Sequence, residues 1–483
     1  MTPFRRSAGA AAGLLALLAV PSGCGTDAVP GGPTPVARAR PNFVVIVADD
    51  MAYGLFGAGR RFPFLQLPNL ERLAAQGVQF ERAFVTTSLC SPSRASILSG
   101  LYAHAHGVTV NEGVELSSGT PTFPQILHDA GYRTAFVGKW HMNGSYDGPR
   151  PGFDHWVSFR GQGTYDDPLL NVDGQRVRRT GYITDVLTDY AVDWLEAAPP
   201  EPLLLVLSHK AVHDPFAPAL RHRAALPGAW MPEPASYRDS FEDKPAWQRR
   251  YARCGGTAAA YANCPDPLPA ALSRWAWSGD DPRRVDYLRT LLALDDSVGS
   301  VLAALERRGL DRSTYVLFIS DNGFFLGEHR LGDKRLAYEE ALRIPLVVAG
   351  PGLSPRTASA MALNVDVAPT LLDLAGLAVP ASMQGRSLAG VLRGQAPSVR
   401  DAFLYEYAPD AYLPVVPAIV ALRTSSQKYV TYPGRPAEYE LYDLAADPGE
   451  VTNLADRPEW QARRAELQQR LDRMLSETGA AVQ

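Results

Sequence analysis

Two pairs of oxygen-bearing side chains lie where metal chemistry is expected in this 483-residue chain. Asp49 and Asp50 end one apolar, β-branched run, and Asp321 and Asn322 end another. In an open α/β sheet, ligands bind outside the carboxyl ends of the strands, so both pairs are expected at one edge. Carboxylates gathered there repel one another unless a cation neutralises them, and oxygen donors favour Ca²⁺ or Mg²⁺. Either pair alone is more simply explained as turn chemistry, whereas their matched positions favour a metal.

A single cysteine marks a second reactive position. Pro92 suits the first turn of a helix and Gly100 suits its end, so Cys90 is expected at a helix N-terminus. Backbone N–H groups and the helix dipole favour an anion there, and Arg94 lies one turn further on. An exposed cysteine in a serine-rich loop and a plain thiolate nucleophile are alternatives, although no Cys-His-Asn arrangement is evident.

Alternating strands and helices are expected to position these residues. Buried strands are predicted at residues 43–48, 135–137, 203–207, 315–319 and 345–348, and helices at residues 68–77, 184–197 and 285–308. This alternation predicts an α/β fold, a large doubly wound and mostly parallel sheet, over residues 41–385.

The pattern changes after about residue 385. Short tyrosine-rich segments with alternating polarity follow at residues 403–407, 419–422, 428–432 and 439–442, and they predict a small antiparallel sheet. A charged amphipathic helix is expected at residues 459–477. Residues 386–483 are therefore predicted to form a smaller C-terminal α+β subdomain.

The first 40 residues are predicted to lie outside the fold. Two arginines precede an apolar run at residues 8–20, which is too short for a membrane span and indicates a signal peptide over residues 1–23. Residues 24–40 are rich in Gly, Pro and Ala and indicate a flexible tether. The end of the run also resembles a bacterial lipoprotein cleavage site, with a proline where that pattern prefers leucine. The chain is therefore expected to be exported, to the periplasm or outside the cell, and a lipid anchor at Cys24 stays an open alternative, its one expected link to a membrane.

The remaining cysteines and the net charge indicate a disulfide and argue against one class of partner. Cys254 and Cys264 lie ten positions apart, which in an oxidising compartment favours a local disulfide over two unpaired cysteines. The formal net charge is −4, so there is no basic excess and no nucleic-acid partner is expected.

Taken together, these residues make the sequence similar to the type I, formylglycine-dependent sulfatases of the alkaline-phosphatase-like superfamily. Cys90 to Arg94 match the C-x-P-x-R signature of that family. Further matches, in order, are G-K-W-H at residues 138–141, H-x-P at residues 213–215, D-N-G at residues 321–323, a lysine-bearing segment at residues 327–334 and a C-terminal signature at residues 440–454. The resemblance covers the chain from about residue 40 to about residue 455.

The resemblance implies a sulfatase that hydrolyses the sulfate ester of a sulfated carbohydrate or an aryl sulfate. A formylglycine-generating maturation enzyme would oxidise Cys90, and one hydroxyl of the resulting hydrate would attack the sulfur. One Ca²⁺ ion would be bound by Asp49, Asp50, position 90, Asp321 and Asn322.

The resemblance also implies roles for the charged and acid–base residues. The negative charge of the sulfate would be offset by Arg94, Lys139 and Lys334. His213 would protonate the departing alcohol oxygen, and His141 would take the proton whose removal regenerates the aldehyde.

The substrate is indicated only by one region. Residues 161–168 and 171–174 are similar to a region of glycan exosulfatases, among which those acting on N-acetylglucosamine 6-sulfate come nearest. A generic surface loop is the structural alternative, and other sulfated carbohydrates, including algal ones, stay open. A phosphonate or phosphate-ester hydrolase of the same superfamily is the main alternative function. A non-catalytic glycan-binding protein is disfavoured because no position of the constellation is missing.

Other histidines are not assigned to catalysis. His104 and His106 are expected to support the site or fill the core. His209 is interpreted as a structural hydrogen-bonding residue or a substrate contact. His209, Lys210 and His213 do not form a recognisable zinc site.

Overall fold

The computed structural model describes residues 40–198, 202–254, 264 and 281–480. The predicted signal peptide, the tether and the proposed lipid anchor at Cys24 lie outside the described residues. Within these ranges, every helix is too short or too polar to cross a membrane.

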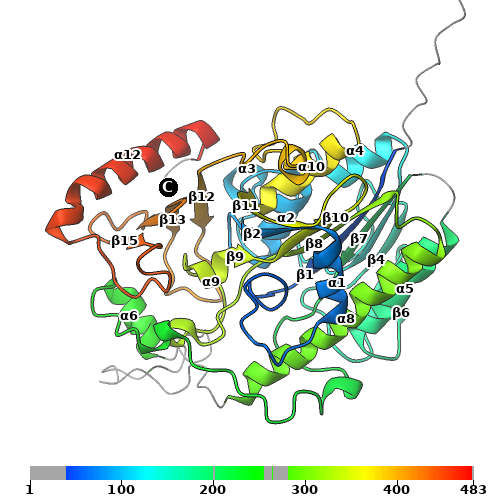
Figure 1. Cartoon of the computed structure of the whole chain (residues 1–483), viewed down its shortest axis with the longest axis horizontal. Helices are drawn as coiled ribbons and strands as arrows, with labels where there is room; N and C mark the ends of the chain where they lie inside the picture. The colour runs from blue at the N-terminus through cyan, green and yellow to red at the C-terminus, as the bar shows by residue number, and fades with distance from the viewer. Residues whose placement is uncertain (1–39, 199–201, 255–263, 265–280, 481–483) are drawn as a thin grey trace, which may run out of the picture. The chain divides into compact units, whose positions relative to one another are not determined.

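A large sheet forms the centre of the described chain (Figure 1). Its strands are β1 (Asn42–Ala48), β2 (Val78–Phe84), β3 (Arg133–Gly138), β4 (His155–Ser158), β5 (Leu169–Val172), β6 (Gln175–Arg178), β7 (Leu203–Ser208), β8 (Thr314–Ser320), β9 (Arg343–Ile344), β10 (Leu346–Ala349) and β11 (Arg356–Leu363). They lie in the order β11-β2-β10-β8-β1-β7-β3-β4-β5-β6, with β9 paired to β2. The central strands β8, β1, β7, β3 and β4 are parallel, which confirms the predicted α/β fold class.

Helices cover both faces of this sheet (Figure 1). The helices of this part of the chain are α1 (Pro68–Gln76), α2 (Cys90–Ser99), α3 (Ala103–His106), α4 (Phe123–Asp129), α5 (Ile183–Ala197), α8 (Pro282–Arg307), α9 (Glu339–Leu342), α10 (Val367–Leu374) and α11 (Ala389–Leu392). Helix α6 (Ala246–Arg253) instead shares a core with side chains from residues 403–442. Strand β1 shows why two faces need covering, because all seven of its residues are buried. Val44 and Ile46 pack in a core with α1, α5 and α8, whereas Val45 and Val47 pack in a core with α2, α4 and α10. The uninterrupted apolar run is therefore that of a strand buried on both faces.

Strand β10 is one of the predicted buried strands of the mostly parallel sheet, and its direction was not part of that prediction. It pairs antiparallel to β8, with Leu346 opposite Ile319 and Ala349 opposite Val316. A parallel strand would require a crossover back to the starting edge of the sheet. The chain instead stays at the edge where β8 ends, and β10 begins from that edge and runs back.

The C-terminal region contains the predicted antiparallel sheet. Strands β12 (Ala402–Tyr407), β13 (Ile419–Thr424), β14 (Gln427–Thr431) and β15 (Tyr439–Asp443) pair in that order. Helix α12 (Gln461–Thr478) buries Leu467, Leu471 and Leu475, which are spaced four residues apart on one face. These leucines share a core with alternate residues of the sheet, as expected of an amphipathic helix packed on a sheet.

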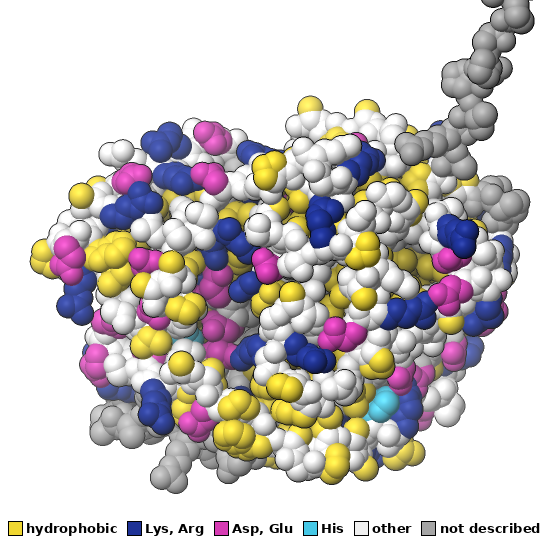
Figure 2. All heavy atoms as spheres, in the orientation of Figure 1, with side chains coloured by type: hydrophobic (Ala, Val, Ile, Leu, Met, Phe, Trp, Pro, Cys, Tyr) yellow, Lys and Arg dark blue, Asp and Glu magenta, His cyan; other side chains and the backbone are white. Residues whose placement is uncertain are grey.

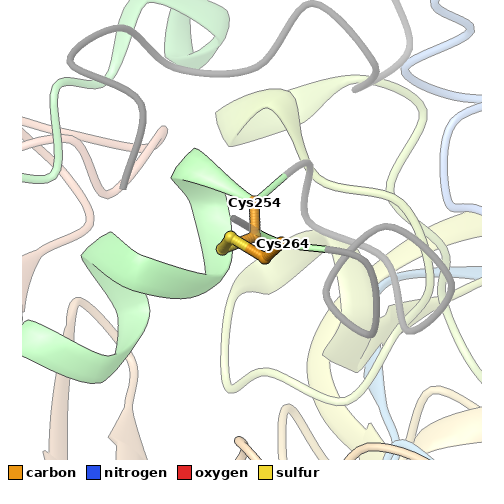
Figure 3. The surroundings of a disulfide bond; sticks show 2 residues. All are labelled: Cys254 and Cys264. Carbon is orange, nitrogen blue, oxygen red and sulfur yellow. A yellow bond between two sulfur atoms is a disulfide. The ribbon is translucent and has the colours of Figure 1, made fainter. Parts of the chain in front are cut away.

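The predicted disulfide between Cys254 and Cys264 is present (Figure 3). Cys254 directly follows α6, and the two Cα atoms are 5.2 Å apart, a separation typical of disulfides. On the face of the molecule shown in Figure 2, basic and acidic side chains are interspersed.

Candidate active site

Two neighbouring strands bring the predicted metal ligands together. Strands β1 and β8 are parallel and end in register, so the residues that follow them meet at one edge of the sheet. The backbone N–H of Asp50 donates to Oδ1 of Asp321 at 3.0 Å. Carboxylate oxygens of Asp49, Asp50 and Asp321 lie within 4.8 Å of one another, and all three residues are buried. Asn322 is also fully buried beside them, and its Nδ2 lies 3.3 Å from Oδ1 of Asp50.

Helix α2 carries Cys90 into the same place. The helix begins at Cys90 and ends at Gly100, which has the left-handed conformation (φ 68°) typical of a glycine C-cap. Every residue of α2 is buried, and most of them are small, so the helix approaches the sheet closely. Cys90 Sγ lies 3.7 Å from Oδ1 of Asp49 and 3.8 Å from Nδ2 of Asn322. The predicted nucleophile thus faces the carboxylate cluster.

Lys139 reaches the cluster from the end of β3. Gly138 precedes it with φ 125°, and a Cβ there would lie 1.8 Å from the carbonyl oxygen of Ser208. Only glycine permits this close approach of β3 to β7. The next residue, Lys139, is directed into the space around Cys90 and the three carboxylates, which we call the pocket. The ammonium of Lys139 is fully buried and donates to Asp49 and, at 2.6 Å, to Oε1 of Gln162.

Lys334 reaches the cluster from a different segment of the chain. It lies in the segment between β8 and α9, and its ammonium donates to Oδ2 of Asp50 at 2.6 Å. The same nitrogen lies 3.0 Å from Cys90 Sγ. Lys334 therefore contacts both a predicted metal ligand and the predicted nucleophile.

The Arg94 guanidinium is engaged with the protein itself. Its Nε donates to Oδ2 of Asp321 at 2.8 Å, and Nη2 lies 2.7 Å from the same oxygen. Its Nη1 donates to the backbone carbonyl of Lys139 at 2.9 Å and to Ser208. The side chain thus holds a carboxylate of the pocket and the backbone that presents Lys139.

His213 is oriented for proton transfer from a single nitrogen. Its Nδ1 lies 2.5 Å from the carbonyl oxygen of Asp214, which only accepts hydrogen bonds, so Nδ1 carries the proton. Nε2 faces the pocket, 3.8 Å from Oδ2 of Asp50. A ring nitrogen of His213 also lies within 4.8 Å of Cys90 Sγ. Burial, with Lys139 as the second cause, lowers the pKa of His213 well below its usual value.

His141 lies beside the residue that follows the predicted nucleophile. Its Nδ1 is 3.3 Å from Oγ of Ser91, and its backbone carbonyl accepts from the same hydroxyl at 3.1 Å. Burial and the nearby Lys139 ammonium lower its pKa well below the usual value. His141 is therefore a neutral ring that can accept a proton.

Burial controls the protonation of the pocket. It raises the pKa of the Cys90 thiol to about 11 despite the nearby Lys139 and Lys334, so the unmodified side chain is a neutral thiol. Burial also raises the pKa of Asp50 to about 7, against the opposing effect of Lys334. For Asp49, burial is outweighed by Lys139 and the other cations, and the pKa lies well below its usual value.

The donor set fits a hard cation. Three buried carboxylates converge, and Oδ1 of Asn322 is buried with no hydrogen-bond partner among the described residues. A buried amide oxygen without a donor is costly unless a ligand completes it. Oxygen donors of this kind are those that Ca²⁺ and Mg²⁺ take in proteins.

The unassigned histidines have structural contacts. His106 Nε2 lies 3.1 Å from Oγ of Ser96, and burial lowers the pKa of this histidine to about 3. His209 Nε2 lies 2.9 Å from Oγ of Ser297 on α8, away from the carboxylates. His104 contacts Glu406 of the C-terminal sheet at 2.9 Å.

The two segments compared with glycan exosulfatases behave differently. Residues 161–165 reach the pocket, because Gln162 contacts Lys139 and the Tyr165 hydroxyl donates to the His213 carbonyl at 2.7 Å. Residues 171–174 instead form the end of β5 and the turn into β6, where Oδ1 of Asn171 accepts from the Gly174 N–H at 2.8 Å. Sequence reasoning assigned no role to Gln162 itself; its position between two glycines was the available signal.

Comparison with known proteins gives consistent results over most of the chain. The family model for sulfatases matches residues 41–377, and a model described as N-sulphoglucosamine sulphohydrolase, C-terminal, matches residues 327–477. The chain is 32% identical to an N-acetylglucosamine-6-O-sulfatase of Bacteroides thetaiotaomicron, over 90% of the chain and 86% of that protein. It is 30% identical to the human N-acetylglucosamine-6-sulfatase, over 86% of the chain and 81% of that protein. A solved structure of a protein in complex with its substrate D-glucosamine-2-N,6-O-disulfate superposes with a TM-score of 0.80, at 31% identity, covering 91% of this chain and 98% of that one.

Proposed function

The chain belongs to the sulfatase family and is a sulfuric ester hydrolase, and from this premise we propose that it removes the 6-sulfate of a glucosamine-type sugar with a bound calcium ion and an oxidised Cys90. The observation that carries the proposal is the buried cluster in which Cys90, three carboxylates and two lysines meet. It is the arrangement expected when an anionic ester must be bound and attacked.

The metal would be held by Asp49, Asp50, Asp321 and Asn322 together with the oxygen at position 90. When present, the ion would screen the sulfate oxygens and lower the pKa of the attacking hydroxyl, which the formylglycine hydrate would supply. The three carboxylates carry as many formal negative charges as the guanidinium and the two ammonium groups carry positive ones. A bound divalent ion would therefore give the pocket a net positive charge. An anionic substrate is favoured by such a pocket.

The unmodified thiol is a poor candidate for the nucleophile. Nucleophilic cysteines need a depressed pKa, whereas the pKa of Cys90 is raised to about 11. No histidine donates to its sulfur among the contacts of the described residues. Oxidation to formylglycine would replace the thiol by an aldehyde, and addition of water to that aldehyde would place two hydroxyl groups at the same position.

The chain's own residues would move the protons. His213, with its Nδ1–H held by the Asp214 carbonyl, presents Nε2 to the leaving oxygen. A bound sulfate ester would add negative charge beside this ring and oppose the burial and the cations that lower its pKa. His141 stays neutral beside Ser91 and would accept the proton of the second hydroxyl. We assign Arg94 to holding Asp321 and the Lys139 backbone, and Lys139 and Lys334 to binding the sulfate.

The substrate assignment is supported by the relatives' activities and by the loop at residues 161–165, which reaches the pocket. Release of sulfate from N-acetylglucosamine 6-sulfate should be compared with release from the 3-sulfated isomer, and with hydrolysis of a phenyl phosphonate monoester. Preference for the 6-sulfate is expected. Faster hydrolysis of the phosphonate would instead favour the phosphonate hydrolase of the same superfamily.

Maturation can be tested without activity. Conversion of Cys90 to formylglycine exchanges sulfur and two hydrogens for oxygen, so the peptide that contains it should be about 18 Da lighter. An unmodified peptide from active enzyme would overturn the nucleophile assignment.

We also propose that the protein is exported, as the N-terminal signal indicates. The Cys254–Cys264 disulfide supports an oxidising compartment. Fractionation with a lipid-labelling control would distinguish secretion from anchoring at Cys24.

A further inference from the structure

Lys139 has more hydrogen-bond donors than the protein uses. A lysine ammonium carries three N–H donors, and this one is fully buried. Within the described ranges, two acceptors meet it: a carboxylate oxygen of Asp49 and, at 2.6 Å, Oε1 of Gln162. The ammonium nitrogen is tetrahedral. Because two of its N–H bonds point at protein acceptors, the direction of the third N–H bond is fixed.

The two acceptors differ in charge. Asp49 is an anion, whereas the Gln162 amide is neutral. A neutral acceptor orients an ammonium and leaves its charge available, whereas a second carboxylate would neutralise it. This distinction matters at a site that must attract an anion.

The loop that carries Gln162 is built to hold it there. Strands β3 and β4 are parallel neighbours and end side by side, with Gly138 opposite Ser158. Lys139 follows the end of β3 and Gln162 lies in the loop that follows β4, so both residues lie at the same edge of the sheet. Gly161 and Gly163 flank Gln162 with φ values of 54° and 64°. A Cβ at Gly163 would lie 2.6 Å from ring carbons of Phe159, so a larger residue would displace the loop.

The same loop also secures the other side of the pocket. The Tyr165 hydroxyl donates to the His213 carbonyl at 2.7 Å, and the Lys210 ammonium lies 4.7 Å from the Tyr165 ring centroid. Two residues of this short loop thus contact different parts of the site: Gln162 contacts the predicted sulfate-binding lysine, and Tyr165 contacts the backbone of the predicted acid. Displacement of the loop would disturb both.

We propose that Gln162 is a positioning residue that orients the Lys139 ammonium without neutralising it, so that the third N–H is directed at a sulfate oxygen of the substrate. The inference rests on the proposed function, because it takes a sulfate ester as the ligand. Gln162 acts through Lys139 and is not itself assigned a chemical step.

The test uses the matured, metal-loaded full-length protein with Gln162→Leu and Gln162→Glu. Leucine removes the acceptor at similar size, and glutamate keeps the acceptor but adds a negative charge. Gln66→Leu and Gln66→Glu are matched controls, because Gln66 is exposed and its amide contacts only the Pro63 carbonyl among the described residues. For each variant, kcat and KM on nitrophenyl sulfate are measured together with the Kd of inorganic sulfate by calorimetry.

Gln162→Leu should lower kcat/KM by about ten- to a hundredfold, the range expected for a lost hydrogen bond to a charged group. Gln162→Glu should weaken sulfate binding more than Gln162→Leu does, even though it preserves the acceptor. A residue that only stabilises the loop would show the opposite order, because glutamate replaces the amide more closely. Thermal unfolding midpoints of both variants equal to that of the wild type would show that the losses of activity and of sulfate affinity do not come from misfolding.

A double-mutant cycle completes the design. In a Lys139→Met background, Gln162→Leu should cause no further loss of sulfate affinity, because its effect passes through the ammonium. Wild-type values for both Gln162 variants, in an enzyme that hydrolyses sulfate esters, would overturn this inference and leave the proposed function intact. If the wild-type protein binds sulfate without hydrolysing its esters, the proposed function fails, and the sulfate Kd values still decide the role of Gln162.

Discussion

Two clusters of buried charge serve different ends in this molecule. The pocket cluster consists of Asp49, Asp50, Asp321, Arg94, Lys139 and Lys334. The sheet cluster lies where the C-terminal sheet meets α9 and consists of Glu339, Arg423, Lys428 and Glu450. In each cluster the formal positive and negative charges are equal in number, so charge balance does not distinguish them.

In the sheet cluster, each charged group lies within 3.0 Å of a group of opposite charge. Lys428 lies 3.0 Å from Glu339 and 2.7 Å from Glu450, and Arg423 lies 2.8 Å from Glu339. Glu450 also accepts from the backbone N–H of Glu339 at 2.7 Å. Burial alone would raise the pKa of Glu339, but Lys428 and Arg423 hold it below its usual value. These contacts tie β13 and β14 to the segment that carries Lys334.

The pocket cluster leaves groups uncommitted. Asn322 Oδ1 has no partner in the described chain, the Lys139 ammonium has a third donor, and the Cys90 thiol is neutral. His213 keeps 16% of its side-chain surface exposed, which gives solvent and ligands access. Three converging carboxylates beside a neutral thiol and an amide oxygen therefore assign the pocket cluster to a ligand, whereas the paired charges of the sheet cluster are assigned to stability.

The largest expected effect is at the nucleophile. Cys90→Ala should leave no measurable turnover, because position 90 would supply the attacking oxygen. The thermal unfolding midpoint should stay close to that of the wild type, since alanine suits a helix start among small residues. Sulfate release at wild-type rates by this variant would refute the assignment.

Loss of the metal should be nearly as severe. Asp321→Ala or prolonged chelation is expected to remove calcium and to lower kcat by about a thousandfold, in line with several kcal/mol of charge stabilisation. Elemental analysis of the wild-type protein checks the ion directly. Stoichiometric zinc with calcium absent would contradict the oxygen-donor argument.

His213→Ala should depend on the leaving group. A sugar alkoxide is a strong base and needs a proton, whereas nitrophenolate leaves with little help. Activity on the sulfated sugar should fall by about a hundredfold to ten-thousandfold, and activity on nitrophenyl sulfate much less. Equal losses on both substrates, at unchanged KM, would mean that another group supplies the proton.

The sheet cluster should respond in stability instead of catalysis. Lys428→Met leaves Glu450 buried without its cation and should reduce the free energy of unfolding by about 3–5 kcal/mol. Below the unfolding transition, kcat/KM should be unchanged. The double variant Lys428→Met/Glu450→Gln should recover part of the loss, and its failure to do so would weaken the ion-pair explanation.

The smallest effect concerns His104, which joins α3 to the C-terminal region. Burial lowers its pKa, but hydrogen bonds to Glu406 and to the Thr478 carbonyl raise it above the usual 6.5. Its stabilising contribution is therefore complete below about pH 6.5 and is lost as the pH rises through the folded-state pKa. His104→Gln should reduce the free energy of unfolding by up to about 1 kcal/mol at low pH, and less at high pH. Urea titrations of the wild type and the variant, below and above the folded-state pKa, measure the loss of unfolding free energy at each pH. A loss that increases with pH would contradict the raised pKa.

The sequence by itself determined the central strands of the sheet and the polar residues that follow them. Apolar runs ending in Asp49-Asp50 and Asp321-Asn322 predicted both strands and the meeting of these side chains at one edge, because local patterning and strand-end position suffice for that. The antiparallel C-terminal sheet was predicted for the same reason. Cys90 at a helix start likewise followed from Pro92 and Gly100.

Only the tertiary structure decided the contacts between these elements. The direction of β10, the engagement of Arg94 with Asp321 and the pairing of Lys139 with Gln162 join residues far apart in sequence. Local patterns carry no information on such pairings, which depend on strand order and on the close approach of backbones. The protonation of the Cys90 thiol was likewise undecided, because it depends on burial, and burial exists only in the folded chain.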